Sequence, residues 1–258
     1  MTGRRLHSVI SGLVLLCALA LPRTVSAAGG VILNTLQGFN DHEPGWSGSI
    51  DGLFSGSGGN TERIILAANG TVQWRGERNR WQLRANWGYE ESNGVNTAKN
   101  ATTHLRHNYD IRKSLATIAF IQAQENAFQR IESRWLVGAG LRADIVDDDE
   151  STVLFGVTPM YEVERVEGQD RVRRGRLSTF LFASHTFDEK FGVSGTGFYQ
   201  PLFEDVGNYR TVGTLTFSME LTGALELKAG ASVDTNSRPA PGVERTDWNT
   251  FTALTVKL

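Results

Sequence analysis

Apolar and polar residues alternate with a period of two along two clear segments of the chain. In residues 64–74 the even positions are apolar, as in Leu66 and Trp74, and in residues 81–90 the odd positions are apolar, as in Trp87. Successive side chains on a β-strand point to opposite faces, so each segment has one apolar and one polar wall. Both segments are predicted to be strands.

The same alternation recurs, with weaker contrast, along the rest of the chain. Six further segments follow it, at residues 100–111, 131–144, 153–161, 215–221, 225–233 and 248–258. Four less distinct strands are expected at residues 45–57, 115–124, 177–187 and 191–199. The pattern predicts an all-β fold, an antiparallel up-and-down transmembrane β-barrel of about 12 strands, an even number as bacterial barrels require.

The lengths of the connections favour the same topology. Short connections at residues 112–114, 188–190 and 222–224 are the fourth, eighth and tenth in order. Residues 236–245, the eleventh connection, are the longest, and residues 164–170 and 201–208 are also long. Outer-membrane barrels have short periplasmic turns and longer outer loops. Even connections are therefore predicted on the periplasmic side, and odd ones outside.

The first 27 residues have the organisation of a secretory signal peptide. Arg4 and Arg5 precede an apolar core at residues 9–21, and the small residues at 25–27 supply a cleavage site. The apolar core is too short to span about 30 Å of hydrocarbon. We expect the mature chain to start at about Ala28.

Three parts of the chain are therefore expected: a signal peptide at residues 1–27, a periplasmic lead-in at residues 28–44, and an outer-membrane barrel at residues 45–258. Past Leu21 no stretch of 18 apolar residues occurs, so a membrane span has to be made of strands. Localisation in the outer membrane follows. The expected partners are outer-membrane lipids, lipopolysaccharide and the barrel-insertion machinery.

Cysteine content and charge exclude several classes of function. Cys17, inside the signal peptide, is the only cysteine, so the mature chain has no disulfide, no cysteine nucleophile and no thiolate metal site. The chain has a formal net charge of −2, and loss of three signal-peptide arginines makes it about −5. Nothing in this balance favours nucleic acid as a partner.

Alternation alone does not say which wall faces the solvent, so a soluble periplasmic barrel that binds an apolar ligand remains an alternative. The signal peptide, the even strand count and the final strand at the C-terminus favour the membrane. Aromatic residues near strand ends would suit the interfacial girdles of such a barrel. They are Trp46, Trp74, Trp81, Tyr89, Tyr109, Tyr209 and Trp248.

Three segments carry a resemblance to a known family. They are GWSGSIDGLFSGSGGNT at residues 45–61, HLRHNYDI at residues 104–111 and WLVGAGLR at residues 135–142. From Gly45 onward the chain resembles the domain of unknown function 481 family, described as salt-induced outer-membrane proteins. The resemblance implies an outer-membrane barrel and no particular activity.

One motif suggests catalysis. Residues 89–94 read YEESNG, and outer-membrane lipid hydrolases carry a similar run with a histidine two positions before Ser-Asn. Here Glu90 occupies that position, and Asn93-Gly94 is a strong signal for a hairpin turn. A lipid-active hydrolase is kept as an alternative to a barrel with no catalytic residues and no enzymatic activity.

Candidate metal sites are weak. His104 lacks further ligands at a suitable spacing, and the acidic run at residues 147–150 lacks the spacing of a calcium loop. We expect neither a metal nor another cofactor.

The polar wall is predicted to line the lumen and mixes both signs of charge. If water fills the lumen, these side chains tune selectivity, and if they pair across it they close it. A structural barrel and a narrow channel are both compatible with this set. Its members are Arg63, Arg84, Glu90, His104, Arg106, Asp110, Glu132, Arg134, Arg142 and Asp144.

The densest basic run is Arg171, Arg173, Arg174 and Arg176. At an outer strand end these arginines are candidates for contact with lipopolysaccharide phosphates, which guanidinium groups bind through paired hydrogen bonds. The alternative is that they neutralise nearby carboxylates, among them Glu162 and Glu164.

Overall fold

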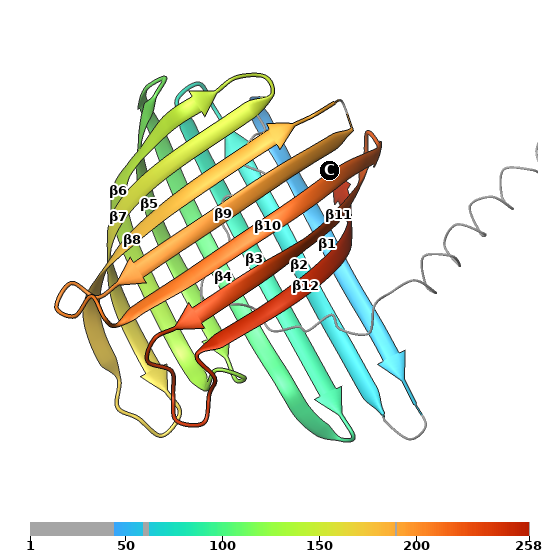
Figure 1. Ribbon diagram of the computed structural model, residues 1–258, viewed down its shortest axis with the longest axis vertical. Helices are drawn as coiled ribbons and strands as arrows, with labels where there is room; N and C mark the ends of the chain where they lie inside the picture. Colours follow the sequence, from blue (N-terminus) through green and yellow to red (C-terminus); the bar gives the residue numbers. More distant parts are fainter. Residues whose placement is uncertain (1–43, 59–61, 189, 258) are drawn as a thin grey trace, which may run out of the picture.

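The computed structural model describes residues 44–58, 62–188 and 190–257, and its strands form one closed antiparallel barrel (Figure 1). The predicted count of 12 strands is confirmed. The strands are β1 (Gly45–Ser57), β2 (Arg63–Arg75), β3 (Asn79–Ser92), β4 (Val95–Arg112), β5 (Leu115–Asn126), β6 (Ile131–Asp147), β7 (Ser151–Val166), β8 (Val172–Thr186), β9 (Phe191–Pro201), β10 (Tyr209–Thr222), β11 (Leu225–Asn236) and β12 (Thr246–Lys257). The predicted signal peptide, and the lead-in up to residue 43, lie outside the described residues.

None of the described residues belongs to a helix long and apolar enough to cross a membrane.

The apolar wall of the barrel faces outward. Trp46, Phe54 and Trp248 are each more than 70% exposed, and large apolar side chains from all twelve strands are exposed as well. An apolar surface of this extent is unfavourable in water, whereas the hydrocarbon of a bilayer solvates it. The alternative of a soluble barrel, which requires the apolar wall inside, is therefore wrong.

Aromatic residues at one end of the barrel form a continuous row. Trp46 is the cross-strand partner of Trp74, which is in turn the partner of Trp81. The ring of Trp81 lies 4.3 Å, centroid to centroid, from that of His107 on β4. A row of tryptophans near strand ends is typical of the boundary between hydrocarbon and headgroups.

The two ends of the barrel differ in their connections. We call the end with residues 76–78, 113–114, 148–150, 187–190 and 223–224 the turn end. The other, the loop end, carries residues 58–62, 93–94, 127–130, 167–171, 202–208 and 237–245. Strand β7 runs to Val166, so its loop starts later than the alternation predicted.

Turn chemistry explains two of these connections. The Asn93-Gly94 hairpin has φ values of 50° and 74°, which asparagine and glycine adopt most readily. At the turn end, the Asp188 carboxylate accepts hydrogen bonds from the backbone N–H groups of Lys190 and Phe191, at 2.8 and 2.7 Å. These two bonds stabilise the ionised form and lower the pKa of Asp188.

The barrel closes through a short seam between its first and last strands. Among the described residues the β1–β12 ladder consists of the pairs Ser49–Lys257 and Ile50–Val256, whereas thirteen pairs join β1 to β2. Figure 1 shows β1 and β12 diverging from the seam toward the loop end. Strand edges without partners are costly in hydrocarbon, so this seam is the weakest part of the wall.

Hydrogen exchange should detect the weak seam. Amides of residues 51–57 and 246–254 are expected to exchange at least about tenfold faster than those in the middle of β6, because local opening needs fewer broken hydrogen bonds. The measurement is exchange followed by mass spectrometry on the folded protein in detergent micelles. Equal protection around the whole barrel would contradict this account of the seam.

Candidate functional site in the lumen

A cluster of charged side chains lies in the loop-end half of the lumen. We call it the loop-end cluster. It comes from strands β6, β7, β8 and β10, and its members are Arg134, Glu162, Glu164, Arg174, Arg176 and Arg210. All share the inward wall of their strands. Arg134, Glu162 and Arg176 are fully buried.

Glu162 is the centre of the cluster. Its Oε2 accepts hydrogen bonds from Arg134 Nη2 at 2.7 Å and from Arg210 Nη1 at 3.1 Å. Its Oε1 accepts from Arg174 Nε at 2.8 Å. Arg176 Nε completes the set, at 3.1 Å from Oε2. One carboxylate therefore holds four guanidinium groups together.

Glu164 accepts hydrogen bonds from two of the same arginines, Arg174 and Arg210. Its Oε1 accepts from Arg174 Nη2 at 2.6 Å and its Oε2 accepts from Arg210 Nη2 at 2.7 Å. Four arginines and two glutamates give the cluster a formal charge of +2. Buried charges are tolerated only when they are paired and hydrogen-bonded, so each carboxylate is needed to keep the arginines inside.

Arg176 also ties a loop to the cluster. Its Nη1 donates to the carbonyl oxygens of Gln200 and Asn208, at 3.0 and 3.2 Å, and its Nη2 donates to Asn208 Oδ1 at 3.2 Å. Asn208 ends the connection between β9 and β10. The cluster thus orders the loop end as well as the lumen.

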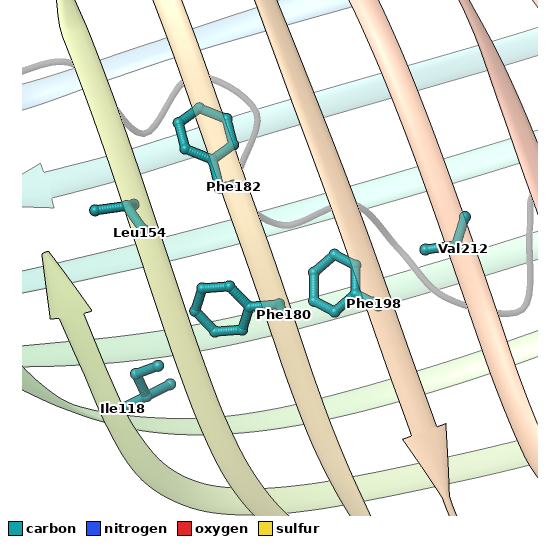
Figure 2. Close-up of a cluster of buried hydrophobic side chains, with 6 residues drawn as sticks. All are labelled: Ile118, Leu154, Phe180, Phe182, Phe198 and Val212. Atoms are coloured by element: carbon teal, nitrogen blue, oxygen red, sulfur yellow. The ribbon is translucent and has the colours of Figure 1, made fainter. Parts of the chain in front are cut away.

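An apolar layer lies next to the charged cluster, inside the barrel (Figure 2). Figure 2 shows Phe180 and Phe198 facing each other from adjacent strands, and their ring centroids are 5.7 Å apart. From β4, the guanidinium carbon of Arg106 lies 5.3 Å from the centroid of the Phe180 ring on β8. That contact crosses the lumen. The layer consists of Ile118, Leu154, Phe180, Phe182, Phe198 and Val212.

Arg142 forms a smaller charged group at the turn end. Its Nε and Nη2 donate to the two carboxylate oxygens of Asp144, at 2.6 and 2.8 Å. Its Nη2 also lies 3.3 Å from Asp110 Oδ1. The bidentate pair holds the guanidinium flat against the inner wall.

Most of the residues predicted to line the lumen face inward. His104, Arg106, Arg134 and Arg142 are at most 5% exposed. The remaining inward members are partly exposed: Arg63, Arg84, Glu90, Asp110 and Asp144. His104 Nδ1 lies 2.9 Å from Gln122 Oε1, and Arg63 Nη2 donates to Glu90 Oε1 at 2.9 Å.

Glu132 requires a correction. It is exposed and pairs with exposed Arg165, with 2.7 Å between Oε2 and Nε. The register between β6 and β7 shifts at Ile131 and Ser133, so the strand begins with a bulge. A bulge adds one residue and reverses the faces that precede it, which simple alternation does not reveal.

The arginine run requires a second correction. Arg174 and Arg176 point into the lumen and bind Glu162, so these two do not reach lipid. The alternative interpretation, neutralisation of nearby carboxylates, applies to them. Arg171 and Arg173 are exposed at the loop end. The run divides because neighbouring residues on a strand face opposite ways.

The candidate chemical motifs lie in different surroundings from those that their chemistry would need. Glu90, which stands where the hydrolases carry histidine, is ion-paired with Arg63. No group of three or more His, Cys, Asp or Glu side chains within the described ranges is placed to hold a metal ion.

Some interior residues were missed from the sequence. Arg210 and the apolar layer were not predicted inside the barrel. The available signal was the parity of β8, where Arg174, Arg176 and Phe180 occupy the same wall. Both walls of β8 are partly apolar, which hid the alternation.

Comparison with known proteins agrees with this architecture. A family model described as "Protein of unknown function, DUF481" matches residues 53–258. A comparison of the sequence with curated proteins finds no match.

The chain is also similar in structure to several solved proteins. A NanC porin structure superposes with a TM-score of 0.50 at 12% identity, covering 81% of this chain and 98% of that one. The translocator domain of the autotransporter NalP from Neisseria meningitidis gives a TM-score of 0.45 at 14% identity and covers 97% of both chains. The CymD monoaromatic hydrocarbon channel gives 0.44 at 10% identity, covering 90% and 94%. The likeness to the NanC porin establishes the barrel fold.

Removing the central carboxylate should destabilise the barrel. Glu162→Gln leaves four arginines facing one buried glutamate, and breaking a buried ion pair costs about 3–5 kcal/mol. The measurement is the free energy of urea unfolding in lipid vesicles. The matched control is Glu132→Gln, which removes the exposed pair with Arg165 and should cost under about 1 kcal/mol. Equal effects of the two variants would show that the loop-end cluster is not the stabilising element.

Proposed function

We propose that this chain, which belongs to the DUF481 family, is a structural barrel of the outer membrane whose lumen is closed to free diffusion and which has no enzymatic activity. The observation that carries the proposal is the loop-end cluster, whose ion pairs join β6 and β7 to β10 with almost no exposed surface. The contact between Arg106 and Phe180 supports it from the middle of the barrel.

Outer-membrane location and the two ends of the barrel are assigned together. The exposed apolar wall and the fold support the outer membrane. We assign the turn end to the periplasm, because short turns occupy that side in such barrels. Residues 1–27 act as a signal peptide, and residues 28–44 form a periplasmic lead-in. An intact mass starting at about Ala28 is expected for protein purified from outer membranes.

The predicted lumen residues keep a structural role in this proposal. Arg63, Arg84, Glu90, His104, Arg106, Asp110, Arg134, Arg142 and Asp144 line or close the lumen. A narrow channel is the second candidate. It is favoured by the small inward side chains of β9 to β11, such as Ser194, Thr214 and Ser232, which leave one side of the lumen less filled.

Contact with lipopolysaccharide is assigned to Arg171 and Arg173 alone. Both are exposed next to a loop-end connection, where the phosphates of the outer leaflet lie in our orientation. Lipopolysaccharide retained during purification measures this contact, and an undiminished amount with Arg171→Ser/Arg173→Ser would exclude it. We also expect the barrel-insertion machinery to be a transient partner.

Planar bilayers test the closed lumen. The protein is expected to give no steady conductance steps in 1 M KCl, because ion pairs and aromatic rings fill the passage. Insertion is checked by the heat-dependent gel shift of protein recovered from the same vesicles. Steady steps that scale with salt concentration would favour the narrow channel instead.

Cysteine labelling is an independent test of whether the lumen is closed, because the mature chain lacks cysteine. A cysteine at Ser178, buried beside Phe180, should resist a charged thiol reagent added from either side. The control is a cysteine at exposed Ser57, which should react. Reaction of both at similar rates would show that water and small ions reach the middle of the lumen.

A further inference from the structure

A cavity of about 650 Å³ opens at the turn end of the barrel. Its walls come from the turn-end parts of β2, β3, β4, β6 and β7 and from the connections that follow β2 and β4. It is rich in basic groups, with six cations against four carboxylates. The cations are Arg75, Arg78, Arg80, Arg112, Lys113 and Arg142. Its volume is in the range of small-molecule sites.

The carboxylates of the cavity are unevenly distributed. Asp110 and Asp144 both contact Arg142, so two of the four acidic groups serve one arginine. Over the whole lining the formal charge is +2, from six cations and four carboxylates. A concave wall with an excess of one sign of charge concentrates counter-ions of the opposite sign.

Arg78, in the connection after β2, lines the cavity and also packs over the exposed ring of Tyr109. Its Nη2 donates to the backbone carbonyl of Ile111 at 3.3 Å, and its guanidinium carbon lies 5.9 Å from the centroid of the Tyr109 ring. These contacts occupy one edge of the guanidinium. The planar group is thereby oriented, which lowers the entropy lost when it binds an oxyanion.

Two buried amide groups lie on the inner wall of β3 and β4, next to the cavity. Arg80, in the cavity wall, is the cross-strand partner of Asn108, and Gln82 is the partner of Arg106. Asn108 and Gln82 are each 1% exposed, yet Asn108 Nδ2 and Gln82 Nε2 have no hydrogen-bond partner among the described residues. A buried donor without an acceptor costs about 1–3 kcal/mol. Both groups lie one step deeper than the residues that line the cavity, and Gln82 Oε1 is without a partner as well.

The cavity has a closed inner end. Leu154 lines it and also belongs to the apolar layer, so the layer forms the floor of the cavity. A ligand that enters from the turn end meets basic side chains and, at the inner wall, Leu154 of the apolar layer. This sequence of surfaces is suited to holding an anion rather than passing it.

We propose that the turn-end cavity is a binding site for a small organic polyanion that carries phosphate groups. Arginine presents paired donors that match phosphate oxygens, and Arg78 and Arg112 line the cavity and are exposed to solvent. The inference rests on the proposed function in one respect: the ligand enters from the turn end, which we assign to the periplasm.

Pyrophosphate is the probe for this site. Isothermal titration calorimetry on the folded protein in detergent should show saturable binding at 0.15 M NaCl. Arg78→Ser/Arg112→Ser should weaken binding at least about tenfold, because two charge-assisted contacts are lost. The matched control is Arg171→Ser/Arg173→Ser at the loop end, which changes the net charge equally and should leave the affinity unchanged.

A second variant tests the deeper wall without changing charge. Gln82→Leu removes one buried amide donor and should weaken pyrophosphate binding about threefold to tenfold. No saturable binding to the wild type, or an equal loss with the loop-end control, would overturn the site. Bilayer currents test the closed lumen separately. If pyrophosphate does not bind and the barrel gives no current, the binding site is refuted but the closed lumen is not. If pyrophosphate binds and the barrel gives steady currents, the closed lumen is refuted but the site is not.

Discussion

The need to pair every backbone N–H and C=O group within hydrocarbon determines the rest of this structure. The described strands meet that need by closing a sheet, and closure sends one side of each strand to lipid and the other to the lumen. The apolar wall is outside because the bilayer solvates it. The inside then collects the charged residues, and these must find partners among themselves.

The loop-end cluster follows from this second requirement. Glu162 on β7 joins arginines from its two neighbours, β6 and β8, and, through Arg210, the more distant strand β10. Such a cluster fixes the distance between parts of the wall that share no backbone hydrogen bonds. It complements the sheet ladder, which joins only adjacent strands, and it is distant from the short seam between β1 and β12.

The sequence predicted the strands far better than the interior contacts. Alternation is a local property, so it gave the strand count and placed residues such as His104 and Arg142 on the inner wall. It failed at Glu132, where a bulge reverses the faces. It also did not show that Arg174 and Arg176 face the lumen while Arg171 and Arg173 are exposed. The partner of an inward charge depends on the register between strands, which Arg210 and Glu162 show at a separation of 48 residues.

The amino-acid composition also does not reveal the sign of the charge inside the lumen. The chain as a whole is slightly acidic, yet the loop-end cluster and the turn-end cavity each carry two more cations than carboxylates. Other acidic groups lie on the connections, as at residues 148–150. In a narrow, low-dielectric interior a fixed positive charge acts over a longer distance than in water. An anion at the turn end would offset that charge, so ligand binding and barrel stability are expected to be coupled through the same arginines.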